Sequence, residues 1–362
     1  MKFFILPALH DEALAVIDVF RKAGNISLSS ISDDVMTVMC GELDHATVYI
    51  GCPSEMGAVR TASFVPEVIS RFSPDLCLMP GICAGRRGKT VIGDLLVAER
   101  AFSYSYGKTT EKGFLPSTRE ETPPENFLSW VRYNVNGEDW KTAAGTQLKK
   151  LGPRDLLLRA VYEYRDPTNS EWLWLRAFDL TKPLAANRNL IPHYQETLAA
   201  LREEGLILFK DKQLVLSDSV QKEMENQIFH ADEYLSTGEL VKVEPKLRYT
   251  NFASGPNVET NTVKLDVPGH KGKYIGYQSE AFHQCSAFDR KVDAIEMEAF
   301  AFYSALKHHK REIGFLAFKA VADHADAYKN DGAHEFGMRL SAAFALEICR
   351  RYIANPLKKN VS

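Results

Sequence analysis

The alternation of short apolar segments with longer segments of helical spacing is the strongest constraint on how this chain can fold. Residues 3–6 form an apolar run typical of a buried strand, and residues 11–22 place apolar side chains at roughly helical spacing. The same alternation continues with strands predicted at 35–40, 46–50, 75–79 and 94–98, a helix at 58–71 and a glycine-rich turn at 80–88. It predicts an α/β fold in which ligand-binding residues follow the ends of strands.

The last third of the chain repeats this alternation. Its predicted elements are strands at 294–296 and 315–321 and helices at 299–307 and 338–352. Residues 119–245 differ, because they hold all four tryptophans and mainly helical patterns. We therefore expect a discontinuous domain, residues 1–118 and 246–355, that is interrupted by an inserted domain at 119–245.

One part of the expected insertion has a recognisable order of elements. A helical pattern ends at Gly205 and is followed by apolar runs at 206–209 and 214–216, on either side of a Lys210-Asp211-Lys212 turn. This order resembles the last helix and wing of a winged-helix domain. Winged helices often bind DNA, but residues 123–245 hold 15 basic against 19 acidic residues, a net charge of -4. Regulatory, packing or protein-contact roles are therefore expected in place of nucleic-acid binding.

The composition argues against several other classes of protein. The whole chain has 44 basic and 47 acidic residues, without the basic excess of proteins that bind nucleic acid or anionic membranes. Charged residues from Asp11 onward interrupt the apolar start too early for a signal peptide, and no uncharged run approaches the roughly 20 residues of a membrane helix. The six cysteines include no CxxC pair, which favours a reduced, cytoplasmic location. His270 and His283 lack partners at metal-ligand spacing, so no metal is expected.

Three acidic residues stand just after or at the end of predicted strands, where open α/β sheets bind ligands. Glu12 follows the first strand, Glu298 follows the strand that ends at residue 296, and Asp323 follows the strand that ends near residue 321. Each taken alone is more often a helix cap or a partner of the helix dipole than a catalyst. In combination with the neighbouring motifs they become candidates for one acid–base site.

These acids belong to a series of motifs. The series is residues 1–12, Ser54-Glu55-Met56-Gly57, Pro74-Asp75, Gly81-Ile82-Cys83-Ala84-Gly85, Gly93-Asp94, Phe252-Ala253-Ser254-Gly255, Glu296-Met297-Glu298-Ala299 and Asp323-His324-Ala325-Asp326. In order and spacing they resemble the nucleoside phosphorylase superfamily, and within it the methylthioadenosine/S-adenosylhomocysteine nucleosidase-like branch. The resemblance covers about 1–118 and 246–355. It implies a three-layer α/β/α phosphorylase/hydrolase-like sandwich, here with a mostly helical, winged-helix-like insertion.

The resemblance implies hydrolysis of the N-glycosidic bond of an adenine nucleoside or nucleotide, either methylthioadenosine- and adenosylhomocysteine-like or AMP- and ATP-like. Such cleavage passes through an oxocarbenium-like ribosyl cation, so the leaving base, the sugar and the nucleophile each need a protein group. By resemblance, Asp323 would act as general acid at N7 of the purine and Glu12 would activate the attacking water. Glu298 would bind the ribose hydroxyls, and Met297 would pack against the sugar.

The resemblance also implies a set of substrate-binding residues. The glycine-rich turn and the segment after Ser254 would meet the purine, while Leu9 and Met56 would line the sugar and its 5′ substituent. The full set is Glu298, Met297, Gly81, Cys83, Ala84, Gly85, Phe252, Ser254, Val258, Met56 and Leu9. Arg86 and Arg87 are candidates for contact with a 5′ phosphate, although solvated surface arginines are the more common case.

Water and phosphate are the two nucleophiles to decide between. Phosphorylases of this superfamily use cationic phosphate clamps where this chain has Met79-Pro80 and Pro7-Ala8-Leu9, and Glu12 would repel a phosphate dianion. Hydrolysis is therefore expected. The alternatives are a phosphate-dependent purine nucleoside phosphorylase and a nucleotide-sensing or defence-effector module regulated through the insertion. No cofactor is implied, and the family's habit of pairing subunits predicts a homodimer.

Overall fold

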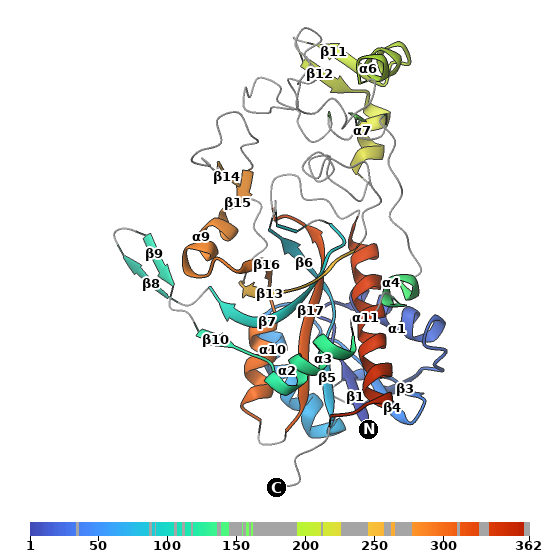
Figure 1. The fold of residues 1–362 in the computed structure, drawn as a ribbon, viewed down its shortest axis with the longest axis vertical. Helices are drawn as coiled ribbons and strands as arrows, with labels where there is room; N and C mark the ends of the chain where they lie inside the picture. Colours follow the sequence, from blue (N-terminus) through green and yellow to red (C-terminus); the bar gives the residue numbers. More distant parts are fainter. Residues whose placement is uncertain are drawn as a thin grey trace.

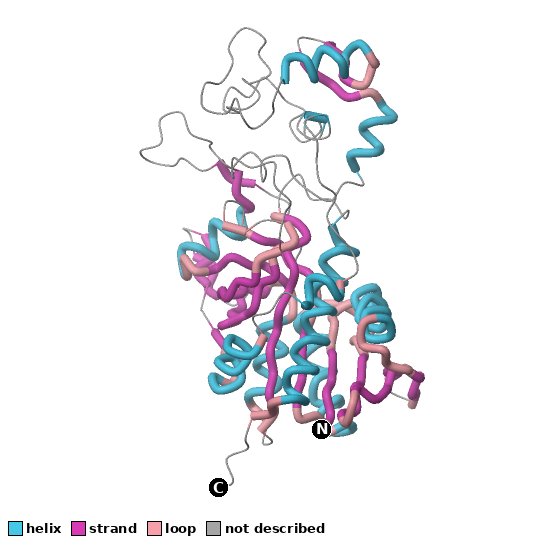
Figure 2. The backbone as a smooth tube through the Cα atoms, turned by 45° about the vertical axis from the view of Figure 1, so that its right-hand side comes forward, coloured by secondary structure: helices cyan, strands magenta, loops and turns pink. Residues whose placement is uncertain are grey.

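A computed structural model describes residues 1–33, 36–86, 89–90, 92–104, 107–110, 113–116, 119–135, 139–144, 154, 157–158, 161, 194–210, 213–225, 245–256, 262–264, 277–309, 312–325 and 333–357. Most of these residues form one large sheet with helices on both faces (Figures 1 and 2). The expected three-layer α/β/α architecture is therefore confirmed.

The central sheet has 11 strands in the order β10-β7-β13-β16-β6-β17-β5-β1-β4-β3-β2. Their bounds are β1 Lys2–Ile5, β2 Ser29–Ser32, β3 Thr37–Leu43, β4 Ala46–Ile50, β5 Leu76–Met79, β6 Ile82–Gly85, β7 Leu95–Ser103, β10 Arg119–Glu121, β13 Leu247–Ser254, β16 Val292–Glu296 and β17 Gly314–Asp323. Strands β4, β1, β5, β17 and β6 are parallel neighbours. Because β7 pairs with both β13 and β17, part of the sheet closes into a ring that includes β16 and β6.

Two groups of helices cover the sheet. One face carries α1 (His10–Lys22), α3 (Glu125–Asn134), α4 (Asp139–Ala143) and α11 (His334–Ala354), and the other carries α2 (Ala58–Phe72) and α10 (Ala299–Lys307). Alternate side chains of β1 divide between the two layers, since Phe3 and Ile5 pack with the first group and Phe4 with the second. Burial on both faces explains why this strand reads as a continuous apolar run.

The glycine-rich segment at 80–88 contains a strand that the sequence did not reveal. Residues 82–85, expected within a turn, form β6, which pairs with β17 and β16. Glycines weaken a strand signal because they favour turns. Here the neighbouring strands supply the pairing, so tertiary contacts override the local preference.

The first elements of the predicted insertion pack with the main body. Strand β10 pairs with β7, and Phe127 of α3 and Trp140 of α4 lie in the core beside α11. The rings of Trp140 and Phe344 meet edge to face, with centroids 5.6 Å apart. Residues 119–135 and 139–144 thus extend the sheet and its helical cover.

The helix and wing order predicted further along the insertion is confirmed. Helix α6 (Tyr194–Glu203) precedes the antiparallel hairpin of β11 (Ile207–Lys210) and β12 (Gln213–Leu216), and α7 (Asp218–Glu225) follows. Figure 1 draws these elements at its upper end. Two hairpins, β8 (Gly107–Thr110) with β9 (Gly113–Pro116) and β14 (Thr262–Lys264) with β15 (Tyr277–Ser279), and helix α9 (Glu280–Phe288) complete the described elements.

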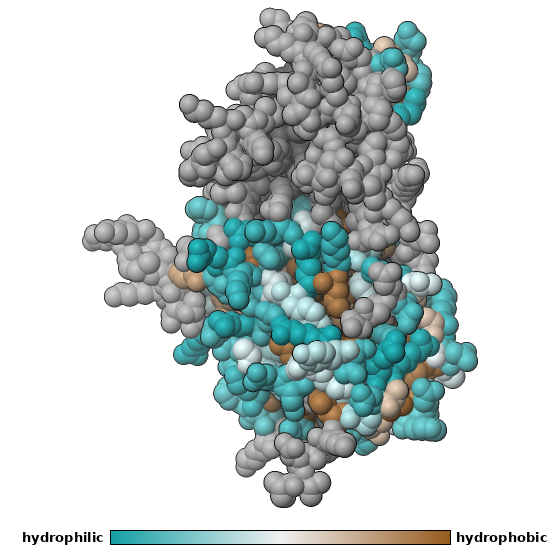
Figure 3. Space-filling view, in the orientation of Figure 1, coloured by the Kyte–Doolittle hydropathy of each residue, from teal (hydrophilic) through white to brown (hydrophobic). Residues whose placement is uncertain are grey.

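The surface drawn in Figure 3 is mainly hydrophilic where the structure describes it, with small separate hydrophobic patches. Exposed large apolar side chains such as Val59 and Phe209 come from different elements. Among the described helices, none combines the length and hydrophobicity needed to cross a bilayer.

Candidate active site

A cavity of about 220 Å³ lies where β1, β16 and β17 end, beside β6. Its described lining combines apolar side chains with four carboxylates, one lysine and one histidine. The lining residues are Ala8, Leu9, Glu12, Met56, Ile82, Cys83, Ala84, Ile295, Glu296, Met297, Glu298, Lys319, Asp323, Ala325 and His334. Three acids that are far apart in the sequence, Glu12, Glu298 and Asp323, therefore meet at one cavity.

Glu12 is held in one orientation by backbone donors. Its Oε2 accepts hydrogen bonds from the N–H groups of Ala8 at 2.8 Å and Leu9 at 3.1 Å, and its Oε1 accepts one from Ile82 at 3.0 Å. A side chain at Gly81 would bring a Cβ within 2.6 Å of Oε1, so this approach requires glycine. Burial raises the pKa of Glu12, and Lys319 and the backbone donors offset only part of that rise.

Glu296 ends β16 and Glu298 directly precedes α10, and the two side chains have different partners. Glu298 accepts a hydrogen bond from the Gly57 N–H at 3.0 Å. Glu296 accepts from the N–H groups of Glu298 and Ala299 at 2.9 and 2.8 Å, and from the Ser254 hydroxyl. Because Glu296 satisfies donors at the start of α10, it fixes the backbone that presents Glu298 to the cavity.

Lys319 is the cation of this site. It projects from the middle of β17 with 1% of its side chain exposed, and its Nζ lies 3.3 Å from Glu298 Oε2 and 4.0 Å from Glu296 Oε2. Burial alone would lower the pKa of Lys319, but Glu298, Glu12 and Glu296 outweigh burial and raise it. The described lining therefore holds one lysine among four carboxylates, with a formal charge of 1 - 4 = -3 when all are ionised.

Asp323 stands at the end of β17, in a turn that fixes its side chain. Its Oδ1 accepts a hydrogen bond of 2.7 Å from the Ala325 N–H, and Ala325 has a left-handed backbone with φ of 51°. The next residue, His324, is buried, and its Nδ1 lies 2.7 Å from the carbonyl oxygen of Gly85. Since a carbonyl can only accept, this bond requires the proton on Nδ1. The turn is thus tied to β6.

Several other predicted binding residues also line the cavity, namely Leu9, Met56, Cys83, Ala84 and Met297. Burial raises the pKa of the Cys83 thiol well above its usual value, which keeps it protonated. Gly81 leaves room for the Glu12 carboxylate, and the carbonyl oxygen of Gly85 accepts the hydrogen bond from His324.

The remaining predicted residues lie elsewhere. Phe252 is fully buried in the core layer of α2 and α10, and the Ser254 hydroxyl donates to Glu296. The guanidinium of Arg86 donates to the Arg290 carbonyl oxygen at 3.3 Å. None of these three side chains is among the described residues that line the cavity. Arg87 and Val258 lie outside the described residues.

Three titratable lining residues were not singled out from the sequence as functional. Lys319 could have been noticed in the sequence, because it is the one charged residue in the otherwise apolar strand predicted at 315–321. Glu296 ends the strand predicted at 294–296, and His334 lies before the helix predicted at 338–352, whereas in the structure it is the first residue of α11. Within the described part of the chain, no group of three His, Cys, Asp or Glu side chains is suited to holding a metal ion.

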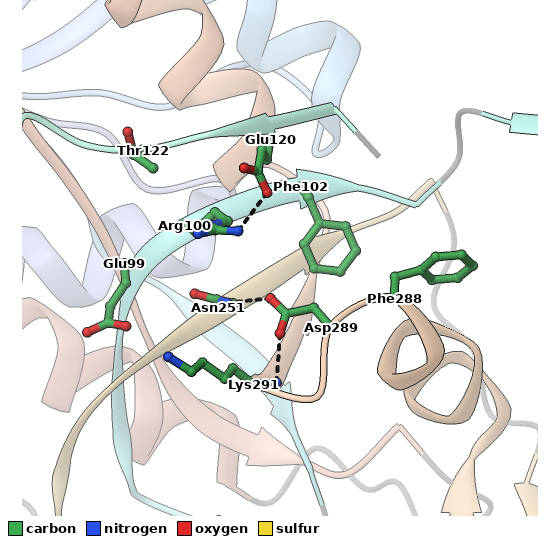
Figure 4. Close-up of a pocket in the computed structure, with 9 residues that line it drawn as sticks. All are labelled: Glu99, Arg100, Phe102, Glu120, Thr122, Asn251, Phe288, Asp289 and Lys291. Atoms are coloured by element: carbon green, nitrogen blue, oxygen red, sulfur yellow. Dashed lines mark hydrogen bonds and ion pairs between the residues drawn. The ribbon is translucent and has the colours of Figure 1, made fainter. Parts of the chain in front are cut away.

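A second hollow, of about 420 Å³, lies over β7, β10 and β13 and the segment after α9 (Figure 4). It is lined by Glu99, Arg100, Phe102, Glu120, Thr122, Asn251, Phe288, Asp289 and Lys291. Arg100 pairs with Glu120 at 2.8 Å, and Asp289 accepts from the Asn251 amide and the Lys291 N–H. One carboxylate oxygen of Asp289 thus bonds to β13 and the other to the backbone two residues further along (Figure 4).

Solved structures share this fold over nearly the whole chain. The methylthioadenosine/adenosylhomocysteine nucleosidase of Colwellia psychrerythraea, solved with adenine, aligns with a TM-score of 0.55 and 14% identity, covering 97% of this chain and 95% of its own. The Neisseria meningitidis enzyme of the same name gives 0.52 and 14%, with 96% and 98% covered. Futalosine hydrolase of Helicobacter pylori gives 0.52 and 13%, with 97% and 98% covered.

Sequence comparison reaches less far. No family model matches the chain. The Sinorhizobium fredii protein y4jS is 40% identical over 60 residues, which is 17% of this chain and 14% of that protein. The structural alignments, with the strand order and the helical layers described above, show that the chain has the nucleoside phosphorylase fold of methylthioadenosine/adenosylhomocysteine nucleosidases and futalosine hydrolase.

Proposed function

We propose that the chain is a purine nucleosidase that hydrolyses the N-glycosidic bond of an adenine nucleoside. The observation that carries this proposal is the convergence of Glu12, Glu298 and Asp323 on one cavity. Stabilising a ribosyl cation requires separate groups for the leaving base, the sugar and the water, and three acids at one cavity meet that requirement. The nucleosidases and the futalosine hydrolase that share the fold add support, because their names describe hydrolysis of nucleosides.

In this proposal Glu12 is the general base for the attacking water. Its carboxylate is immobilised by three backbone N–H groups, so little reorganisation is needed when it takes the proton. Its raised pKa makes it a better proton acceptor than an exposed glutamate. Asp323 protonates N7 of the leaving purine, Glu298 binds the ribose hydroxyls, and Met297 packs against the sugar. Lys319 offsets part of the charge of Glu12 and Glu298.

The charge of the cavity favours water over phosphate as nucleophile. Even with Asp323 protonated, Glu12, Glu296 and Glu298 outnumber the single Lys319 among the described lining residues, and a phosphate dianion would be repelled there. The same argument disfavours a 5′ phosphate on the substrate, and Arg86 donates to a backbone carbonyl outside the lining. Leu9 and Met56 suit an uncharged 5′ substituent. We therefore favour a nucleoside over a nucleotide.

Product analysis tests the proposal. The protein is incubated with adenosine, methylthioadenosine, AMP and ATP, each with and without phosphate, and free adenine is followed by chromatography. Release of adenine without phosphate supports the nucleosidase, and strict dependence on phosphate would support a phosphorylase instead. Binding without release would support a sensing or effector module. The Glu12→Gln and Asp323→Asn variants show whether any release comes from this cavity.

Three further predictions remain part of the proposal. We expect a homodimer in the cytoplasm, and we expect residues 119–245 to act as a regulatory or protein-contact insertion. The acidic balance of 123–245 supports protein contact over contact with nucleic acid.

A further inference from the structure

Arg339 joins three parts of the molecule. It lies on α11, and its Nε donates to the carbonyl oxygen of Ala144 at 2.9 Å. Its Nη1 bonds to Asp18 Oδ2 on α1 at 2.6 Å. Ala144 directly follows α4, and residues 139–144 lie within the predicted insertion at 119–245. One partly buried guanidinium therefore links that segment to both α11 and α1.

The same part of α11 also contacts the strand beside Glu12. Gly337 lies so close to β6 that a Cβ there would be 2.9 Å from Ile82 Cγ2. The N–H of Ile82 in turn donates to Glu12 Oε1. Glu12 belongs to α1, the helix that Arg339 holds through Asp18. Residues 337–339 thus contact β6, which donates to the Glu12 carboxylate, and α1, which carries Glu12.

Asp18 has a second cationic partner, Lys22, at 2.9 Å on the same helix. The Lys22 side chain is 71% exposed and the Arg339 side chain 16%. Lys22 cannot link α1 to another element, because it lies one turn further along α1 itself. Arg339 is therefore the group through which Asp18 reaches the insertion segment.

From these contacts we infer that Arg339 is a positioning residue that transmits the state of the inserted segment to Glu12. With residues 139–144 seated on α11, the guanidinium has both acceptors, and α1 is fixed against α11. Without the Ala144 acceptor or the Asp18 partner, the restraint on α1 relaxes. Glu12 then loses its fixed orientation toward the cavity. The catalytic consequence rests on the proposed function, whereas the structural coupling does not.

The chain offers a matched control on the same helix. Arg351 bonds to Glu347 on α11 and to Asp139 at the start of α4. It thus ties α11 to the same segment, and its ion pairs within the described residues reach α4 and α11 and not α1. Arg351→Gln removes a similar charge and a contact to the same segment, and should leave Glu12 in place.

Hydrogen exchange in the full chain tests the coupling without requiring activity. The amides of Ala8, Leu9 and Ile82 donate to Glu12, so their exchange rates report its orientation. We expect Arg339→Gln to speed exchange at these amides by about tenfold, and Arg351→Gln to change it by less than about twofold. Asp18→Asn breaks the same link from the other side and serves where Arg339→Gln folds poorly.

A double-mutant cycle tests whether the insertion segment uses this link. Trp140→Phe loosens α4 from Phe344 and should also speed exchange at the three amides. In the Arg339→Gln background it should add little, because the link is already broken. Full additivity, unchanged exchange in Arg339→Gln or an equal effect of Arg351→Gln would overturn the inference.

Turnover gives a separate readout. If the wild type releases adenine, Arg339→Gln should lower kcat by about tenfold and leave KM within about twofold, since substrate contacts are intact. A wild type that releases no base would refute the proposed function, while the exchange result would still decide the coupling.

Discussion

The cavity and the second hollow both gather charged residues, yet they are built differently. In the cavity, Glu12 and Glu298 are 2% and 4% exposed, and backbone N–H groups hold them. In the second hollow, the side chains of Arg100 and Glu120 are 42% and 51% exposed and pair with each other. The hollow is the larger of the two. The difference teaches that the candidate site is marked by buried carboxylates that accept hydrogen bonds from backbone N–H groups. Neither the volume of a hollow nor the number of its charged residues marks it.

Burial also changes the chemistry of each charge. Burial in the cavity raises the pKa of Glu12. An ion pair that stays exposed to water adds little to the free energy of unfolding, because both charges remain hydrated. Buried charges need compensation, and Lys319 offsets part of the negative charge of the three glutamates.

The largest effect is expected from removing the base. Glu12→Gln keeps the size of the side chain but cannot accept a proton, so adenine release should fall by about 10²–10⁴-fold. The matched change in the second hollow, Glu120→Gln, should leave the rate within about twofold. Both rates are measured by chromatography at saturating nucleoside. Equal losses in the two variants would show that the cavity is not the site.

Removing the buried cation should cost stability. Lys319→Met preserves much of the side-chain length but leaves Glu12, Glu296 and Glu298 without their cation, so the free energy of unfolding should fall by about 3–5 kcal/mol. Urea unfolding followed by circular dichroism measures the change. A loss below about 1 kcal/mol would mean that the carboxylates do not need this lysine as ions.

The rate should depend on pH through Glu12. The base form exists only above its pKa, so the rate falls as the pH falls through that value, by about tenfold per pH unit below it. Because burial raises the pKa of Glu12, this decline should begin at a higher pH than an exposed glutamate would give. Profiles of kcat/KM from about pH 4 to about pH 9 measure it. Asp289→Asn, in the second hollow, should not move the decline.

The smallest effect belongs to the exposed ion pair. Arg100→Gln breaks the contact with Glu120, and the free energy of unfolding should change by at most about 1 kcal/mol because both side chains are hydrated. The same urea experiment measures it beside Lys319→Met. A larger cost for Arg100 than for Lys319 would reverse the contrast between the two regions.

Elements with strong local patterns could be predicted from the sequence. The strand at 46–50 and the helix at 299–307 were predicted with the bounds that the structure has, and the helix predicted at 11–22 begins one residue earlier. Each of these segments has the period of its own element, so local packing preferences agree with the fold. Strands β2, β6, β10 and β13 were not predicted as strands. They are polar, short or rich in glycine, and their pairing depends on distant neighbours.

The residues of the candidate site also fall into those that the sequence predicts and those that it does not. Glu12, Glu298 and Asp323 could be chosen because they follow strands and stand in recognisable motifs. Phe252 and Arg86 could not be placed, since a phenylalanine in a motif can serve core or cavity and an arginine in a turn can point to either side. The sequence offered no local sign that Arg339 would reach Asp18 and Ala144, which lie 321 and 195 positions away.

By itself the sequence determined the layers of this protein and the acids at the ends of its strands, because periodic burial is a local property that the order of residues encodes directly. Only the tertiary structure decided which carboxylates share one cavity and which cation compensates them. It also decided which backbone donors hold Glu12. These features depend on the register of strands far apart in the chain, and that register follows from the packing of the whole sheet.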